Sequence, residues 1–108
     1  MSIERLFIMT ATAAILPNSI RADLERAVQI LKSVGCSAIF LFGSAAEGNF
    51  KNTSDIDLAV RGCPPRAFFP VFGQLILELE HPVDLIDLDD HSLFGQHLQR
   101  NSKLVQIG

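Results

Sequence analysis

The stretch that decides the fold runs from Ser54 to Val60 and reads SDIDLAV. Its polar and apolar residues alternate, which is typical of a strand with one face buried against a core. In such a strand Asp55 and Asp57 point to one face, and Ile56 points to the core. Adjacent carboxylates repel each other unless a cation lies between them, and their oxygens are preferred ligands of Mg²⁺ and Mn²⁺. The D-x-D pattern is also common on solvent-facing strands, so further residues are needed to indicate a metal site.

A Gly-Ser pair lies upstream of this stretch. The almost wholly apolar segment from Ser37 to Phe42 predicts a buried strand, and it leads directly into Gly43 and Ser44. A backbone opened by glycine can turn its N–H groups towards a phosphate, and the serine hydroxyl adds a donor. The polar residues from Glu47 to Ser54 predict a loop. Gly-Ser turns are ordinary connections, so this feature alone is weak evidence.

A third carboxylate lies in the strand predicted from Val83 to Leu88. Asp84 and Asp87 are three positions apart, so they face opposite sides of that strand and only one can join the Asp55 face. We favour Asp84, because Asp87 approaches the strand end and solvent. The other acidic residues of this region are predicted to form a solvated rim: Glu78, Glu80, Asp87, Asp89 and Asp90.

Helical spacing predicts helices between these strands. The first follows Pro17 and buries a stripe made of Ile20, Leu24, Ala27, Val28 and Leu31. The second begins near Pro70 and buries Phe72, Leu75, Ile76 and Leu79. A last short helix is predicted to end near Arg100, followed by a short strand from Leu104 to Ile107. The order of elements predicts an α/β (α+β) fold, with helices packed on a small sheet.

Length and composition set further limits. The 108 residues are 48% hydrophobic and 19% charged, which predicts one globular domain over 1–108, with 1–17 as an N-terminal extension of ambiguous structure. One core of this size leaves no room for a separate acceptor domain. The net charge of −3 argues against nucleic-acid binding by bulk electrostatics. No apolar run reaches the ~18 residues of a membrane span.

The cysteines bear on the cellular compartment. Cys36 and Cys63 are too few for a disulfide framework or a zinc site, so we interpret them as thiols of a reducing compartment and predict a cytoplasmic location. A signal peptide ending near Ala13 is the alternative. It is disfavoured because Glu4 cancels the positive charge of Arg5.

Taken together, the segment LFGSAAEG (41–48), the DID triplet (55–57) and Asp84 resemble the nucleotidyltransferase superfamily typified by DNA polymerase β. The short chain is most similar to the minimal nucleotidyltransferases of bacteria and archaea. The resemblance extends roughly from Ser19 to the C-terminus. It implies a small mixed sheet and transfer of a nucleoside monophosphate, with ATP as the favoured donor, to a hydroxyl.

The resemblance also implies roles for individual residues. Two Mg²⁺ ions would be held by three catalytic carboxylates, which correspond to Asp55, Asp57 and Asp84. The nucleotide would be bound by Gly43, Ser44, Lys51 and Ser54. Many minimal nucleotidyltransferases have arginines at two positions that are here Ala45 and Glu47, with Lys51 and Arg61 as candidate replacements. We therefore expect triphosphate binding to be weak and almost wholly metal-dependent.

Minimal nucleotidyltransferases are commonly paired with a helical HEPN-domain protein in toxin–antitoxin modules, where they act as antitoxin by attaching AMP to a toxin tyrosine. The resemblance thus implies a protein acceptor on a HEPN partner, with no role for a membrane or for nucleic acid. The alternative is a catalytically weak module that neutralises or scaffolds such a partner. The sequence leaves open whether identical copies of the chain assemble.

Overall fold

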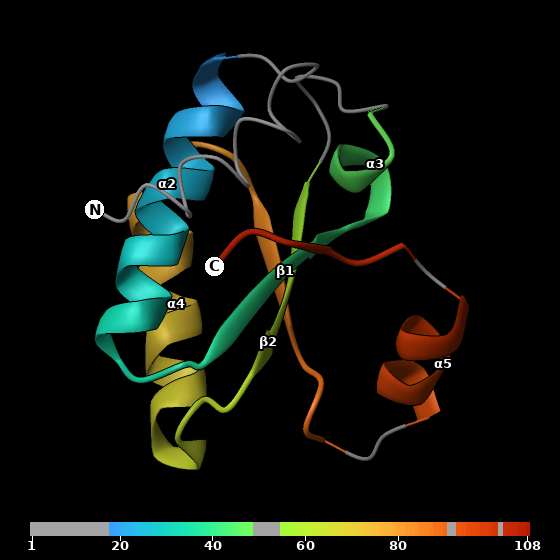
Figure 1. Cartoon of the computed structure of the whole chain (residues 1–108). Helices are drawn as coiled ribbons and strands as arrows, with labels where there is room; N and C mark the ends of the chain where they lie inside the picture. The colour runs from blue at the N-terminus through green and yellow to red at the C-terminus, as the bar shows by residue number, and fades with distance from the viewer. Residues whose placement is uncertain (1–17, 49–54, 91–92, 102) are drawn as a thin grey trace.

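The computed structural model describes residues 18–48, 55–90, 93–101 and 103–108 (Figure 1). Its strands are β1 (Ala38–Phe42), β2 (Ile56–Arg61), β3 (Val83–Asp87) and β4 (Val105–Gln106). They form one sheet in the order β3-β2-β1-β4. β1 pairs antiparallel with both β2 and β4, whereas β2 and β3 are parallel. The sheet is therefore mixed, and the predicted α+β fold with helices on a small sheet is confirmed.

Helices cover both faces of the sheet. The longer ones are α2 (Asn18–Ser33), α4 (Phe68–Glu78) and α5 (Leu93–Asn101), and a four-residue helix, α3 (Gly43–Ala46), directly follows β1. A 3₁₀ turn, η1 (Pro65–Ala67), precedes α4. Figure 1 shows α2 and α4 side by side against one face, with α5 on the opposite side.

Strand alternation divides the core between these two faces. Within β1, Ile39 and Leu41 belong to the larger core under α2 and α4, whereas Phe42 belongs to a smaller core that includes Leu98 of α5. The stripe predicted for the first helix is fully buried in the larger core. Residues 1–17, the ambiguous N-terminal extension, lie outside the described residues.

Helix α4 differs from its prediction. It begins at Phe68, before Pro70, and its buried positions Val71 and Leu75 are four residues apart. Ile76, which was predicted to be buried, is 58% exposed, so that prediction was wrong. The reason is that α4 is apolar around most of its circumference, so spacing alone does not show which side faces the sheet.

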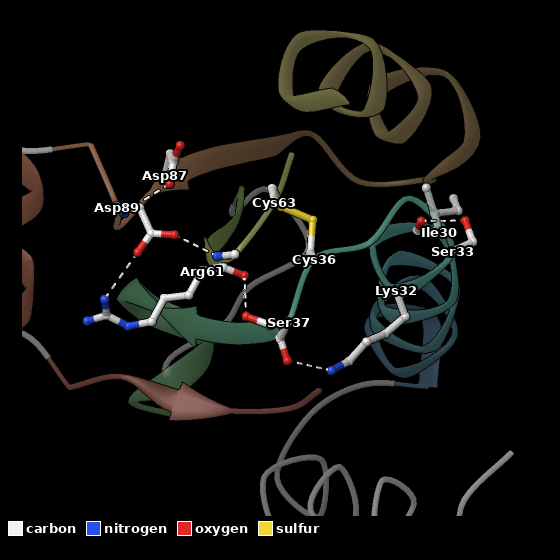
Figure 2. The surroundings of a disulfide bond; sticks show 10 residues. Ile30, Lys32, Ser33, Cys36, Ser37, Arg61, Cys63, Asp87 and Asp89 are labelled. Atoms are coloured by element: carbon white, nitrogen blue, oxygen red, sulfur yellow. Dashed lines mark hydrogen bonds and ion pairs between the residues drawn. A yellow bond between two sulfur atoms is a disulfide. The ribbon is translucent and has the colours of Figure 1, made fainter. Parts of the chain in front are cut away.

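The cysteines also differ from their prediction, because Cys36 and Cys63 form a disulfide (Figure 2). Cys36 lies two residues before Ala38 and Cys63 lies two residues after Arg61, and Ala38 and Arg61 are paired across β1 and β2. Antiparallel pairing therefore brings the cysteines together, with their Cα atoms 3.9 Å apart. The interpretation as free thiols was wrong, and the prediction of a reducing compartment loses its basis.

The described helices do not include any that is long and apolar enough to cross a membrane.

Candidate active site

The register of β2 and β3 places the predicted carboxylates at one end of the sheet. Asp55 immediately precedes β2, and Asp57 is the second residue of that strand. In the parallel pairing Asp57 lies opposite Asp84, and two residues further on Ala59 lies opposite Ile86. Ala59 and Ile86 face the smaller core, so strand alternation places Asp57 and Asp84 on that same face.

The three carboxylates interact electrostatically. The pKa of Asp57 is raised above its ordinary value, first because the side chain is partly buried, then because of the charges of Asp84 and Asp55. Asp55 and Asp84 are exposed. Asp57 is thus the central member of an acidic group whose charges repel each other.

Gly43 lies against Asp57. The last residue of β1, Phe42, pairs with Asp57, and Gly43 follows with a φ of 71°. A Cβ atom placed on Gly43 would lie 2.3 Å from Oδ2 of Asp57 and 3.1 Å from its Cγ. Only glycine satisfies both the left-handed conformation and this close approach. The backbone at the start of α3 is therefore held against the central carboxylate.

Gly43 and Ser44 begin helix α3, where the sequence predicted an open Gly-Ser backbone. Ser44 is half-buried. Helix α3 contacts β1 and β2 and lies at the end of the sheet where β2 begins (Figure 1). Ala45 is only 1% exposed and belongs to the larger core. Glu47 follows the helix and is exposed. At the two positions where many minimal nucleotidyltransferases have arginine, this chain therefore has a buried alanine, Ala45, and an exposed negative charge, Glu47.

Of the two candidate replacements for those arginines, Arg61 is described by the structure and lies far from this site. Arg61 is the last residue of β2, roughly 13 Å along the strand from Asp57. Its guanidinium bonds to Gln99 and lies 3.5 Å from Asp89, which also accepts a 2.6 Å hydrogen bond from the Gly62 N–H. The suggestion that Arg61 replaces a phosphate-binding arginine was thus wrong. Asp89, which was predicted to be part of a solvated acidic rim, instead contacts Arg61 and Gly62 (Figure 2). Lys51 and Ser54 lie outside the described residues.

The carboxylates fit a divalent cation by the chemistry of their donor atoms. Hard cations such as Mg²⁺ prefer carboxylate oxygens, and a cation would relieve the repulsion that raises the pKa of Asp57. In the described parts of the chain no three His, Cys, Asp or Glu side chains already converge as a metal-binding group. Asp84 instead accepts a 3.0 Å hydrogen bond on Oδ1 from the N–H of Leu85. Side-chain rotation is therefore needed before the three carboxylates share a cation.

A buried Asp–His pair near this site was missed by the sequence analysis. Asp23 of α2 is 5% exposed, and its Oδ2 lies 2.7 Å from Nδ1 of His81, just before β3. The available signal was the position of Asp23 on the apolar face of its helix, three residues after Ile20 and four before Ala27.

Comparisons with known proteins identify the family to which this fold belongs. A model of the polymerase β nucleotidyltransferase family matches residues 25–106. No curated protein sequence matches the chain. Among solved structures, a toxin–antitoxin with AMP-PNP is 27% identical at a TM-score of 0.60, with 76% of this chain and 71% of that chain covered.

Mutants of the toxin–antitoxin MntA–HepT are also similar. One, in which two aspartates two positions apart are changed to glutamate, is 25% identical at a TM-score of 0.59, covering 76% of this chain and 71% of that chain. Another, in which a tyrosine is changed to alanine, is 28% identical at a TM-score of 0.57, covering 74% of this chain and 68% of that chain.

Proposed function

Because the chain belongs to the polymerase β nucleotidyltransferase family, we propose that it transfers AMP from ATP to a hydroxyl of a protein partner. The observation that supports this best is the pairing of Asp57 with Asp84, with the Gly43 backbone held against Asp57. This arrangement combines carboxylates whose oxygens suit a divalent cation with the half-buried backbone that opens helix α3, at one end of the sheet. Cations and backbone N–H groups are what nucleotidyl transfer from a triphosphate requires, because both stabilise the charge on the phosphates.

The three carboxylates have distinct roles in this proposal. Two Mg²⁺ ions, held by Asp55, Asp57 and Asp84, would neutralise the triphosphate and lower the pKa of the acceptor hydroxyl. Asp57 is the central ligand because it is the least exposed and is repelled by both neighbours. Asp84 lies on an edge strand of the described sheet with an exposed side chain, where an acceptor from another chain can approach.

The reaction is a substitution at the α-phosphorus of ATP. The acceptor oxygen forms a bond to that phosphorus, the bond to the β-phosphate oxygen breaks, and pyrophosphate leaves. The proton of the acceptor hydroxyl passes to Asp84, which acts as general base. Gly43 and Ser44 would bind the β- and γ-phosphates through backbone N–H groups and the serine hydroxyl.

Triphosphate binding is proposed to depend on metal. Ala45 is buried, Glu47 is negative and Arg61 is bonded at the far end of β2, so these three positions add no positive charge beside the carboxylates. Three carboxylates repel a triphosphate unless cations intervene. Titration of ATP should therefore give measurable binding with Mg²⁺ and none in EDTA, and tight binding in EDTA would contradict the proposal.

The partner is proposed to be a HEPN-type toxin, with this chain as the antitoxin. The similar solved structures are of toxin–antitoxin pairs, and one of them contains AMP-PNP. The described fold has no second layer of elements that would hold an acceptor, because its helices are all packed on the single sheet. We therefore propose that the acceptor hydroxyl lies on another chain.

One observation favours a second candidate function. Because Ala45 and Glu47 replace expected arginines, the chain would also suit a catalytically weak module that neutralises or scaffolds a HEPN-type protein by binding alone. This function requires a partner surface but no turnover.

Incubation with radiolabelled ATP, Mg²⁺ and the protein encoded by the neighbouring gene separates the two functions. Transfer predicts label on the partner that disappears in the Asp55→Asn/Asp57→Asn variant. The Asp90→Asn variant is the matched control, because it removes an exposed carboxylate outside this group. Partner binding without label in the wild type would refute transfer and support the binding module.

A further inference from the structure

Asp23 is a buried carboxylate that the reaction itself does not use. Among the described residues it is the one charged side chain that is almost fully buried. It accepts hydrogen bonds from the backbone N–H of Glu80 at 3.0 Å and of His81 at 2.9 Å, and it contacts Nδ1 of His81 at 2.7 Å. A carboxylate removed from water needs such partners, so these contacts fix the 80–81 turn to helix α2.

The same turn is bonded to the strand that contains the central carboxylate. The carbonyl oxygen of Pro82 accepts a 2.8 Å hydrogen bond from the N–H of Ile56, which lies between Asp55 and Asp57. The next residue, Val83, pairs with Ile56 and begins β3. Asp23 is therefore connected to the first paired residues of β2 and β3 through two sets of contacts, those of Asp23 with the 80–81 turn and the hydrogen bond between Pro82 and Ile56.

The position of the 80–82 turn matters because charge repulsion acts against the pairing of β2 with β3. Asp57 and Asp84 lie opposite each other in the parallel pairing, and two carboxylates at neighbouring positions repel each other where the strands begin. β3 is an edge strand of the described sheet, so β2 is its only hydrogen-bonded neighbour there. The turn that leads into β3 is the place where an anchor opposes this separation most directly.

We propose that Asp23 is a positioning residue for the transfer reaction, holding the 80–82 turn so that Asp84 stays opposite Asp57. This inference rests on the proposed nucleotidyltransferase function, and it assigns to α2 a role in the geometry of that site. Asp23 is not among the proposed metal or nucleotide ligands, and its hydrogen bonds described above are with Glu80 and His81. Its effect on the reaction is through the placement of Asp84, which receives the acceptor proton.

Asp23→Asn tests this role with little change of shape. The amide nitrogen cannot accept a hydrogen bond, so at least one of the three contacts is lost. We expect kcat to fall about 10–100-fold, as for residues that orient metal ligands, with KM for Mg·ATP changed by less than about threefold. We also expect the Ile56 amide to exchange its hydrogen faster, because its acceptor Pro82 is no longer fixed.

The matched control is Ile30→Val, a buried substitution on the same helix that destabilises the core without touching the turn. Measurements are made where both variants are fully folded. The proposal is supported if only Asp23→Asn loses kcat and Ile56 protection. It is overturned if both variants lose activity in step with stability, or if Ile56 exchange in Asp23→Asn matches that of Ile30→Val.

Failure of the proposed function gives a different result. If the wild type transfers no AMP to any partner, hydrogen exchange in Asp23→Asn still tests whether Asp23 holds the 80–82 turn. Unchanged protection of the Ile56 amide would show that it does not. Faster exchange would show that Asp23 holds the turn but has only a structural role, which overturns its part in the reaction. If Asp23→Asn does not fold, His81→Ala removes the side-chain contact with Asp23, leaves the backbone hydrogen bond from the His81 N–H, and is judged by the same two measurements.

Discussion

Replacing Asp84 with asparagine should stabilise the metal-free protein while abolishing AMP transfer. The asparagine side chain is nearly isosteric with aspartate, and its Oδ1 can still accept the hydrogen bond that Asp84 accepts from the N–H of Leu85. The substitution therefore removes one negative charge with little other change. That charge is one of the two that raise the pKa of Asp57.

The size of the effect follows from strand geometry. Paired residues on neighbouring strands lie about 5 Å apart, and at that separation two unit charges repel by roughly 0.8 kcal/mol in water and about 3 kcal/mol at an effective dielectric of 20. Asp84 is exposed and Asp57 is only half-buried, so solvent screening favours the lower part of this range. A gain of about 1 kcal/mol corresponds to a rise in Tm of about 4–6 °C for a domain of this size.

Thermal unfolding in EDTA, followed by circular dichroism, measures this change. Asp90→Asn makes the same change in net charge but lies outside the carboxylate group, so its Tm should stay within about 1–2 °C of the wild type. Mg²⁺ should then raise the Tm of the wild type more than that of Asp84→Asn, because the variant has lost a ligand. A lower Tm for Asp84→Asn in EDTA would refute the reasoning and show that Asp84 is a structural hydrogen-bonding residue.

Three further predictions follow from the same contacts. Because the pKa of Asp57 is raised in the folded protein, the contribution of Asp57 to metal-free stability should be lost as pH rises from the ordinary pKa of 3.8 through the raised value; urea midpoints of the wild type should fall relative to those of Asp57→Asn over that range, and a constant difference would contradict this. Reduction of the Cys36–Cys63 disulfide, which spans 27 positions, should cost up to about 3–4 kcal/mol, measured by urea unfolding with and without dithiothreitol; equal midpoints would show that the bond adds no stability. Gly43→Ala should lower stability by about 1–3 kcal/mol and abolish transfer, because its Cβ would overlap Asp57; retained labelling of the partner would contradict this.

Much of the fold was predictable from local pattern. The alternation at 55–60 identified β2, the apolar run ending at Phe42 identified β1, and the spacing of Ile20 and Leu24 identified the buried face of α2. These predictions succeeded because each element has one clearly apolar side. The prediction for α4 failed at Ile76 because that helix lacks a clear polar side.

The candidate site was predictable in its residue types and less so in its surroundings. Three aspartates and a Gly-Ser turn are visible as a pattern, and their assignment to a family agrees with the match over residues 25–106. The pairing of Arg61 with Asp89 at the far end of β2 was not visible, because it depends on where α5 and the β3 end meet the strand. The partnership of Asp23 and His81, 58 positions apart, was hidden for the same reason.

By itself the sequence predicted most of the strands and helices, though not α3 or the start of α4, and it placed Asp55 and Asp57 on one face of their strand. Those properties are local, since they depend on alternation, helical spacing and the chemistry of side chains within a few positions. Only the tertiary structure decided that Cys36 meets Cys63, that Gly43 lies against Asp57, and that Asp57 lies opposite Asp84. Each of these contacts joins segments distant in the chain, and strand order and register, which local pattern does not specify, bring them together.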